Sequence, residues 1–388
     1  MKKVLIFPSD DRLGLASMID HYNKANFEVY VPKYGSFGLN WSKLARWPAL
    51  LCKDKNSKLN LLDNPVLSTD PIMFGEDWFL TNEEVISYYV QKDTTHLPTC
   101  ILIDEVEAKN IKIDMYHSLR GSDNYHSEYK KIIKEYFPNA TWTSSAICPY
   151  ISLEKFKYKE NQPNLLTKII PASYENFNYN NCMNIFCTDV EFRLHHHSQQ
   201  NIFDRKPIAA SFNHNYHVRY PDDFKLFQGM NEVLKSKNLQ QVKNYGGNIR
   251  GMGADVRYSG GGPTGNYDTL SPLENTIKFC EISAVVHFKS ADYGGGVFFH
   301  ALHSSTPMIT TQKYVNVTNS HKYLVHGKNC IIVNDERSAA VAVELLYHDK
   351  NIRGKLINGM FELKNKLTSE DYWDNWKTFI NTLQSYKT

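Results

Sequence analysis

The chain has 388 residues, of which 42% are hydrophobic and 22% are charged. This length exceeds what one hydrophobic core usually organises and predicts two domains, while the composition excludes a disordered or fibrous chain. The 44 basic and 41 acidic side chains leave a formal charge of only +3, so bulk charge gives no support for a protein held on nucleic acid by phosphate neutralisation.

The first residues predict a strand–helix–strand unit. Val4–Phe7 is a short continuous apolar run, which is typical of a buried parallel strand. Leu13–Lys24 places its apolar residues on one helical face, and Phe27–Val31 alternates as a second strand. A crossover of this kind begins a doubly wound sheet.

The rest of the first half is less regular. Residues from Lys33 to about His96 are rich in Trp, Lys and Pro and predict inserted loops and helices. Regular structure is then expected as a strand at Cys100–Ile103, a helix at about Tyr125–Tyr136, and strands near Ala140–Thr143 and Leu165–Ile170.

A second series of alternating elements follows the polar stretch Leu194–Lys206. Pro207–Phe212 predicts a strand, and Asp223–Ser236 predicts an amphipathic helix capped by Asp222 or Asp223. Further strands and helices are expected at Gln241–Tyr245, Leu273–Cys280, Ala284–Phe288, Gly296–His303, Pro307–Thr310, Cys330–Val333, Ala339–Tyr347 and Ser369–Gln384. This order predicts two Rossmann-like, doubly wound α/β domains over residues 1–200 and 201–368, facing each other across a cleft, with residues 369–388 as a closing helix.

The cysteines and the apolar segments bear on the cellular setting. Seven scattered cysteines without a Cys-x2-Cys pair indicate free thiols in a reducing compartment. The apolar run at the N-terminus is too short for a signal peptide, and no stretch approaches the roughly 18 apolar residues of a membrane span. We therefore expect a cytoplasmic protein, in the host cytoplasm if the AT-rich residue usage reflects a virus.

The most informative motif for function is Lys289–Gly296, which contains the glycines Gly294, Gly295 and Gly296. It lies between a predicted buried strand and a predicted helix. Glycines at a helix N-terminus let the backbone approach a ligand closely, and the unpaired N–H groups with the positive end of the helix dipole attract phosphate. Read without its neighbours, the triplet is equally consistent with a flexible loop.

The spacing around the glycines favours the ligand interpretation. Asp292 and His300 stand eight residues apart, and Ser305-Thr306-Pro307 precedes the next strand. This pattern resembles the Glu-x7-Glu signature of retaining GT-B glycosyltransferases, with Asp and His in place of the two acids and Ser305 in place of a glycine. A carboxylate accepts hydrogen bonds from both ribose hydroxyls, whereas a neutral imidazole at His300 offers one acceptor and one donor.

Other segments follow the same family order, over roughly residues 207–385. Arg219 and Lys225 occupy the first strand–loop–helix junction of the second domain, where the resemblance implies contacts to the donor diphosphate. Fixed cations there stabilise the charge that develops on the leaving nucleotide. The turn with Gly246 and Gly247 is similar to the family's turn under the nucleotide, and Asp292 is implied to contact the sugar.

The resemblance therefore implies a GT-B fold and transfer of a sugar from a nucleotide-diphosphate sugar, a UDP- or GDP-sugar, to a hydroxyl with retention. No further cofactor and no catalytic metal are implied. The acceptor would be a glycan, a small molecule or modified DNA, bound by the first domain. Gly14, Asp104 and His117 are candidates on that side; alternatively, the last two are a surface acid and a turn histidine.

Three other functions stay open at this level. A phage-type enzyme would glycosylate hydroxymethylated DNA bases, using Lys33–Lys58 as a local DNA-facing patch. A nucleotide-sugar epimerase or a non-catalytic sugar-nucleotide-binding protein would share the fold. Two other motifs are discounted: His195-His196-His197 lacks standard metal-ligand spacing, and the glycine-rich Ser259–Gly265 lacks the Lys-Ser/Thr of a phosphate-binding P-loop.

Overall fold

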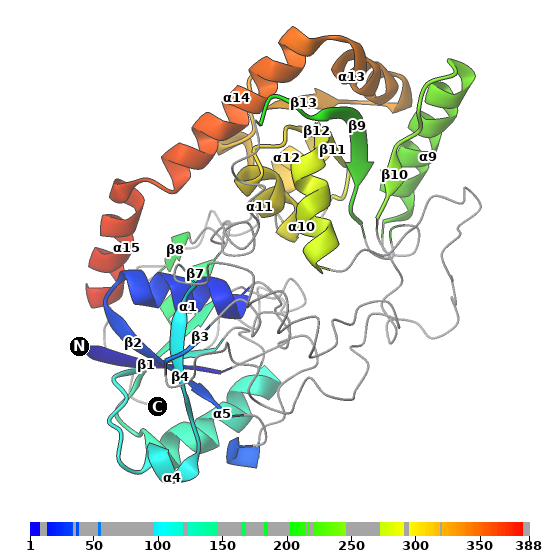
Figure 1. The fold of residues 1–388 in the computed structure, drawn as a ribbon. Helices are drawn as coiled ribbons and strands as arrows, with labels where there is room; N and C mark the ends of the chain where they lie inside the picture. Colours follow the sequence, from blue (N-terminus) through cyan, green and yellow to red (C-terminus); the bar gives the residue numbers. More distant parts are fainter. Residues whose placement is uncertain are drawn as a thin grey trace.

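The structure of the chain is a computed structural model (Figure 1). The described residues are 1–7, 14–33, 36–38, 53–55, 97–118, 123–145, 164–167, 182–184, 202–213, 216, 220–245, 272–290, 295–318 and 320–382. Within them the strands form two separate sheets, and every strand pair in each sheet is parallel. The predicted α/β class with parallel sheets is confirmed.

The first sheet has eight strands in the order β3-β4-β2-β1-β5-β6-β7-β8. Their bounds are β1 Lys2–Phe7, β2 Phe27–Pro32, β3 Lys53–Asp54, β4 Thr99–Ile103, β5 Met115–Ser118, β6 Thr141–Ser145, β7 Asn164–Thr167 and β8 Cys182–Asn184. The chain moves outward from β1 to β2 and β4, then returns to β5 on the other side of β1. This reversal of strand order is the mark of a doubly wound sheet.

The second sheet has five strands in the order β10-β9-β11-β12-β13. Their bounds are β9 Lys206–Ser211, β10 Lys243–Asn244, β11 Ile282–His287, β12 Met308–Thr311 and β13 Cys330–Val333. Here the chain passes from β9 to β10 and then returns to β11 on the opposite side of β9. The second sheet is therefore doubly wound as well.

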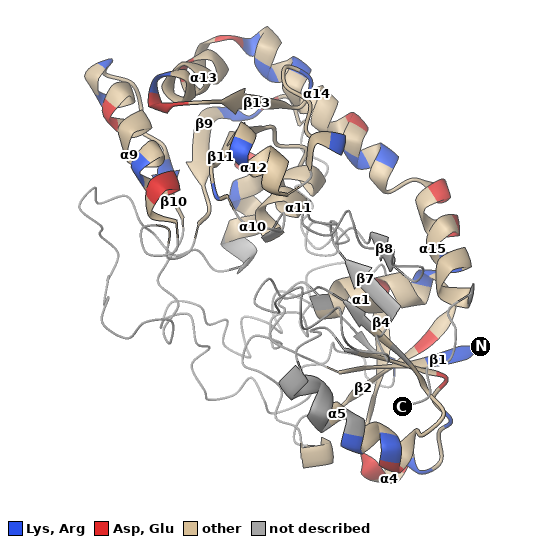
Figure 2. Cartoon of the chain, turned by 180° about the vertical axis from the view of Figure 1, so that it is seen from behind, with Lys and Arg blue, Asp and Glu red and all other residues tan. Residues whose placement is uncertain are grey.

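The helices lie between and after these strands. Their bounds are α1 Gly14–Lys24, α4 Glu105–Ala108, α5 Asp123–Tyr136, α9 Pro221–Ser236, α10 Pro272–Glu281, α11 Gly295–His303, α12 Gln312–Val317, α13 Glu336–His348, α14 Lys350–Leu367 and α15 Glu370–Thr382, with short 3-10 turns η1 Ser36–Gly38 and η7 Ser320–Lys322. Lysines, arginines and carboxylates are interspersed along α9 and α14 (Figure 2), as on ordinary solvated helices.

Strand β1 is buried on both faces, which explains its continuous apolar run. Val4 and Leu5 are both fully buried, although successive side chains of a strand point to opposite faces. Leu5 and Phe7 belong to a cluster that includes α5 residues such as Ile133. The α1 side is equally closed, since Ile19 and other apolar residues of that helix are buried.

The second sheet separates two apolar clusters. One includes Phe279, Val285 and Phe298, and draws on α10, α11 and α14. The other includes Phe224 of α9 and Val286 of β11, and draws on α9 and α13. Because β11 contributes neighbouring residues to the two clusters, helices cover both faces of the sheet, as the doubly wound prediction requires.

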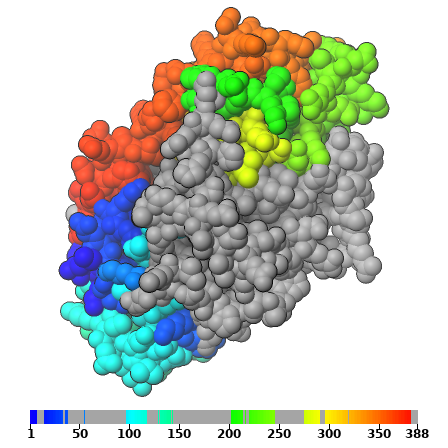
Figure 3. Space-filling model, in the orientation of Figure 1, coloured from blue at the N-terminus to red at the C-terminus, as the bar shows by residue number. Residues whose placement is uncertain are grey.

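The C-terminal helix returns to the first half of the molecule. Trp376 of α15 is fully buried, and its Nε1 donates to the carbonyl oxygen of His21 in α1 at 2.8 Å. The His21 Nε2 and the Tyr372 hydroxyl lie 2.7 Å apart, and the Lys24 Nζ lies 3.9 Å from the Trp373 ring centre. Figure 3 shows the red C-terminal segment beside the blue N-terminal one. A C-terminal helix that returns to the first half is thus confirmed over Glu370–Thr382.

Several expectations for individual elements need correction. Helix α14 was not predicted, because its two glycines weaken the apolar period that the sequence shows. Strand β5 and the short helix α4 were also missed. Cys100, Cys280 and Cys330 are free thiols, as expected for these three. No helix of the described residues is long and apolar enough to cross a membrane. The exact domain boundaries stay predictions.

Candidate functional site

The strand order of the second sheet reverses between β9 and β11. In open parallel sheets, ligands bind outside the carboxyl ends of the strands at such a reversal. The chain leaves β9 towards α9 and leaves β11 towards α11. The first turns of α9 and α11 are therefore the helix ends nearest to the expected ligand.

Helix α9 begins differently from the sequence prediction. Tyr220 is the N-cap and makes no side-chain capping bond, while Pro221 occupies the first helical position. Proline is well suited to that position because its fixed φ is helical and its missing N–H would be unpaired there. Asp222 and Asp223 thus lie inside the first turn, so the prediction that one of them is the cap was wrong.

Asp223 joins the start of α9 to the segment that follows β11. Its Oδ2 accepts hydrogen bonds from the backbone N–H of Ser290 at 2.8 Å and from the Ser290 hydroxyl at 2.7 Å. The aspartate is 7% exposed. Charge-assisted bonds of this kind are stronger than neutral ones. The carboxylate therefore fixes the two segments on either side of the strand reversal to each other.

A reciprocal amide contact extends the β9–β10 pairing. The N–H of Asn213 donates to Asn244 Oδ1 at 3.0 Å, and Asn244 Nδ2 donates to the Asn213 carbonyl at 3.1 Å. The Asn213 side chain donates to the Ser211 hydroxyl at 2.9 Å, while its Oδ1 is buried and has no partner among the described residues. Asn244 thereby joins the backbone after β9 to the end of β10, at the edge where a ligand is expected.

Lys225 lies in the second turn of α9 and is exposed. Among the described residues it forms no ion pair. The first turn of α9 carries Asp222 and Asp223, whereas the first turn of α11 carries no acidic residue. Carboxylates compensate the positive end of a helix dipole. An anion is therefore attracted by the start of α11 and by Lys225 rather than by the acidic first turn of α9.

Gly295 and Gly296 are the first two residues of α11, where the sequence predicted phosphate-binding backbone. The other end of this helix is fixed by the buried Arg205. Its guanidinium donates to the carbonyl oxygens of Phe279 and Ile282, each at 3.2 Å, and also to the Ser304 carbonyl and the Thr306 hydroxyl. Burial lowers the pKa of Arg205 to about 10, so it keeps its charge at neutral pH. It caps the carboxyl ends of α10 and α11.

The turn after α11 explains why this family pattern has a glycine where the chain has Ser305. Ser305 has a φ of 57°. Its N–H donates to Leu302 at 3.0 Å, and the N–H of Thr306 donates to Ala301 at 2.8 Å. These bonds form a Schellman motif, whose left-handed residue is usually glycine. Serine is accommodated there at a cost in local strain.

His300 lies on α11 and stacks on Phe279 of α10, with ring centres 5.0 Å apart and planes 25° apart. The histidine is half-buried, and its Nδ1 is a buried atom. The buried Nδ1 is therefore not accessible to a ligand. In the predicted ribose role, His300 would contact one hydroxyl at a time, where a carboxylate could accept from two.

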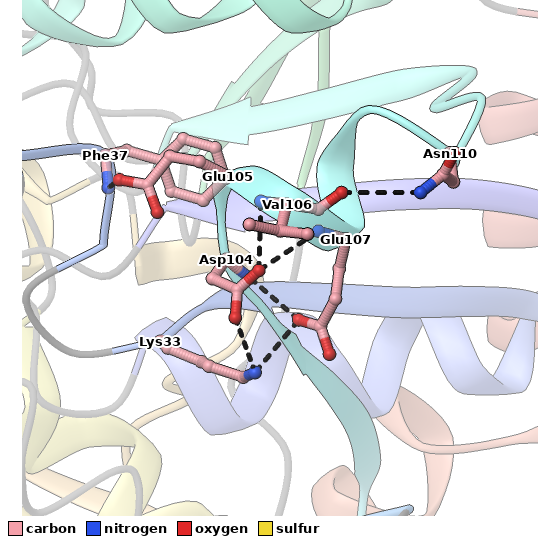
Figure 4. Close-up of polar contacts among 7 residues, drawn as sticks. All are labelled: Lys33, Phe37, Asp104, Glu105, Val106, Glu107 and Asn110. Atoms are coloured by element: carbon pink, nitrogen blue, oxygen red, sulfur yellow. Dashed lines mark hydrogen bonds and ion pairs between the residues drawn. The ribbon is translucent and has the colours of Figure 1, made fainter.

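On the first sheet, Asp104 is engaged by its own surroundings (Figure 4). It caps α4 by accepting from the N–H groups of Val106 and Glu107, both at 3.0 Å. Lys33 Nζ lies 2.8 Å from Asp104 Oδ2 and 3.0 Å from Glu107 Oε2. The hydrogen bond from Lys33 holds the pKa of Asp104 below its usual range. The nearby Glu105 accepts from the N–H of Phe37, which has a φ of 57°.

His117 lies in β5 and is fully buried. Its Nδ1 lies 2.8 Å from the Thr143 hydroxyl and 3.1 Å from the Tyr22 hydroxyl of α1. Burial lowers the pKa of His117 to about 3, so the ring is neutral at physiological pH. Gly14 is the first residue of α1. Acceptor binding by Gly14, Asp104 and His117 stays a prediction.

The remaining predicted site residues lie outside the described residues: Arg219, Gly246, Gly247, Asp292 and Gly294. The same holds for His195-His196-His197 and for the loop Ser259–Gly265. No group of three or more metal-binding side chains occurs within the part of the chain that the structure describes. Sequence reasoning missed the contacts of Asp223 with Ser290 and of Asn244 with Asn213, since nothing in the sequence indicates that these distant pairs meet.

Comparison with known proteins identifies the fold. No family model matches the sequence, and no curated protein matches it. The structure is similar to that of Anabaena HepE in complex with UDP-glucose, with a TM-score of 0.54 and 8% identity over 99% of this chain and 100% of that chain. HepE in complex with UDP and glucose gives 0.55 and 9% over the same shares. S. aureus MnaA with UDP gives 0.48 and 10%, over 99% and 98%. The chain has the predicted GT-B fold.

Proposed function

We propose that the protein is a glycosyltransferase that moves a sugar from a UDP-sugar to an acceptor hydroxyl, with retention at the anomeric carbon. The observation that carries the proposal is the similarity of the whole chain to HepE, whose structure contains UDP-glucose. The second half binds the donor and the first half binds the acceptor.

The geometry at the strand reversal supports this assignment of the donor half. As the glycosidic bond breaks, the UDP leaving group gains negative charge, which preorganised cations and N–H groups stabilise. Lys225 supplies an exposed cation, and Gly295 and Gly296 supply the start of α11. In the proposal Arg219 is the second cation, Asp292 contacts the sugar, and His300 Nε2 contacts the ribose.

The turn with Gly246 and Gly247 lies under the nucleotide in this proposal, and Gly294 adds a backbone donor beside α11. Lys225, Arg219 and the α11 dipole perform the charge stabilisation that a divalent metal ion performs in other transferases. We therefore expect turnover to continue in the presence of a chelator. A loss of activity with EDTA that Mg²⁺ or Mn²⁺ restores would contradict this part.

The acceptor is a hydroxyl compound, with a glycan or small molecule favoured over DNA. The DNA alternative relied on Lys33–Lys58 as a basic patch. Lys33 is paired with Asp104 and Glu107, and Lys55 lies 3.2 Å from Glu28. Cations neutralised by neighbouring carboxylates contribute little to phosphate binding. The ion pairs of Lys33 and Lys55 thus weaken the case for a DNA-facing patch.

The test compares two lysines of the same helix. Lys225→Ala removes the cation beside the proposed diphosphate, whereas Lys235→Ala removes an exposed cation at the far end of α9. We expect Lys225→Ala to lower kcat for UDP-glucose hydrolysis or transfer by about 10²-fold, as for other single electrostatic stabilisers. Lys235→Ala should retain wild-type activity. Equal activity of the two variants, or no response of the wild type to UDP-sugars, would contradict the proposal.

Stereochemistry needs a separate measurement. NMR of the product formed from an α-linked donor should give the α-anomer. A β-linked product would leave transfer in place and overturn retention.

A further inference from the structure

We propose that Asp223 is a positioning residue that locks the two donor-side segments together, so that Lys225 and the start of α11 meet one diphosphate. This inference rests on the proposed function and deepens it, because it assigns a role to a residue that does not itself contact the donor. It follows from the place of the Asp223–Ser290 contact in the sheet rather than from any sequence motif.

The contact joins two segments that follow the paired strands β9 and β11 and that also meet where Lys289 Nζ lies 5.0 Å from the Tyr220 ring centre. Asp223 belongs to the chain that leaves β9, and Ser290 belongs to the chain that leaves β11. These are the two strands between which the strand order reverses. A ligand at this point touches both segments. Any change in their spacing alters the distance between Lys225 on one side and Gly295 on the other.

Two bonds to a single oxygen make the contact directional. Ser290 offers both its backbone N–H and its hydroxyl to Asp223 Oδ2, at 2.8 and 2.7 Å. The residue is nearly buried, so water competes weakly for the carboxylate. Loss of such charge-assisted bonds leaves the groups that they paired unsatisfied. Ser290 would then lose its contact with the first turn of α9.

The contact with Ser290 also reduces the repulsion that Asp223 would exert on a bound diphosphate. A carboxylate beside a diphosphate repels it, unless its charge is taken up elsewhere. Asp223 lies in the first turn of α9, where the helix dipole favours a negative charge, and it accepts two hydrogen bonds. The negative charge of Asp223 is thus stabilised by the helix dipole and by Ser290, while Lys225, two residues later, stays exposed.

Asp222 provides a matched control. It carries the same charge in the same turn but is exposed, and it makes no hydrogen bond to Ser290. Asp222→Asn and Asp223→Asn therefore change the electrostatics of the helix start in the same way. Only Asp223→Asn weakens the lock. Ser290→Ala removes one of the two donors, and Ser290→Thr retains both.

The experiment measures kcat and KM for UDP-glucose, the Kd of UDP, and Tm for each full-length variant. We expect Asp223→Asn to lower kcat/KM by about 10- to 100-fold, the range given by loss of hydrogen bonds to a charged group. Ser290→Ala should lower it less, Ser290→Thr should restore it, and Asp222→Asn should stay within about 2-fold of the wild type. The double variant Asp223→Asn/Ser290→Ala should be no worse than Asp223→Asn alone, because both remove the same contact.

Three outcomes would overturn the lock: an equal effect of Asp222→Asn, a fall in Tm with unchanged kcat/KM, or strict additivity of Asp223→Asn and Ser290→Ala. Amide exchange at Ser290 without nucleotide reports the lock independently, since Asp223→Asn should accelerate it. If the wild type neither binds UDP nor hydrolyses UDP-glucose while Ser290 is protected, the proposed function fails and the positioning role with it, although the contact exists. If UDP binds but Ser290 exchanges freely, the lock alone is wrong.

Discussion

Two lysines, one beyond the carboxyl edge of each sheet, differ in whether nearby carboxylates neutralise their charge. Lys33 follows β2 and is paired with both Asp104 and Glu107, whose hydrogen bonds raise its pKa. Lys225 belongs to the unit that follows β9 and is exposed, with no ion pair among the described residues. A cation that nearby carboxylates neutralise has little attraction left for a ligand anion. Among the described residues, Lys225 thus has the unneutralised charge that the proposed donor site requires, whereas Lys33 does not.

The aspartates at the two edges also differ in what they contact. On the first sheet, Asp104 holds a short helix and a lysine that belong to its own edge. On the second, Asp223 is directed away from Lys225 and towards Ser290.

The largest effect is expected from Trp376→Ala, which removes the buried ring that α15 places on α1. Trp376 is fully buried and donates to His21, so truncation should destabilise the fold by about 3–5 kcal/mol. The half-buried Trp373, beside Lys24, is the control, and its truncation should cost about 1 kcal/mol. Urea unfolding measures both. Similar losses for the two variants would show that α15 does not join the halves in this way.

Each half contains a buried histidine, so the free energy of unfolding should fall as the pH is lowered. Burial lowers the pKa of His117 and of His287 to about 3, from 6.5. Between these values the unfolded chain binds more protons than the folded chain, so stability falls as pH decreases through this window. The slope is about 1.4 kcal/mol per pH unit for each histidine once the pH is below 6.5.

Urea unfolding between pH 6.5 and 5 tests this prediction. His117→Gln and His287→Gln should each reduce the pH slope by about 1.4 kcal/mol per pH unit relative to the wild type. If only one variant reduces the slope, the two halves differ in how they bury their strand-end histidines. An unchanged slope in both would contradict the assignment of neutral, buried rings.

Two glycines of α14 test how closely the second half is packed. A Cβ on Gly359 would overlap the carbonyl oxygen of Lys328, whereas a Cβ on Gly354 meets nothing within 4 Å. Gly359→Ala should therefore destabilise by about 1–3 kcal/mol, and Gly354→Ala should stabilise by about 0.5–1 kcal/mol through helix propensity. Differential scanning calorimetry should give Tm shifts of opposite sign. Stabilisation by both would show that the 325–330 turn moves freely away from α14.

The smallest change in stability is expected for a pair of variants that compares the two sheet edges directly. Asp104→Ala removes the cap of α4 and should cost about 1 kcal/mol of stability, while the affinity for UDP stays unchanged. Lys225→Ala should do the reverse, with stability retained and UDP affinity lowered. Unfolding measurements give the stability of both variants, and calorimetric titration gives their affinity for UDP. A loss of UDP affinity in Asp104→Ala would place the nucleotide near the first sheet instead.

Much of the fold could be predicted from local patterns, because buried parallel strands are continuous apolar runs. Val4–Phe7 and Cys330–Val333 were identified in this way and lie in β1 and β13. Helix α14 was missed because Gly354 and Gly359 interrupt its apolar period, although Gly359 is needed for close packing. Strand β5 was missed because its four residues include His117 and Ser118, which dilute the apolar signal.

The candidate site, like the fold, could be predicted from local sequence only in part. Local sequence placed Lys225 and the glycines Gly295 and Gly296 at helix starts, as the structure has them. Asp223 was expected to cap α9, but Pro221 moved the cap to Tyr220 and left the carboxylate for Ser290. That contact joins residues 67 positions apart, and its partner depends on how β11 pairs with β9. No local pattern carries such information.

Hydrogen–deuterium exchange of the wild type with and without UDP would locate the donor site. We expect new protection in peptides covering residues 220–227 and 295–303, with none in peptides covering 101–118. Protection confined to 101–118, or binding of UDP without protection at either helix start, would contradict a donor site at the reversal between β9 and β11.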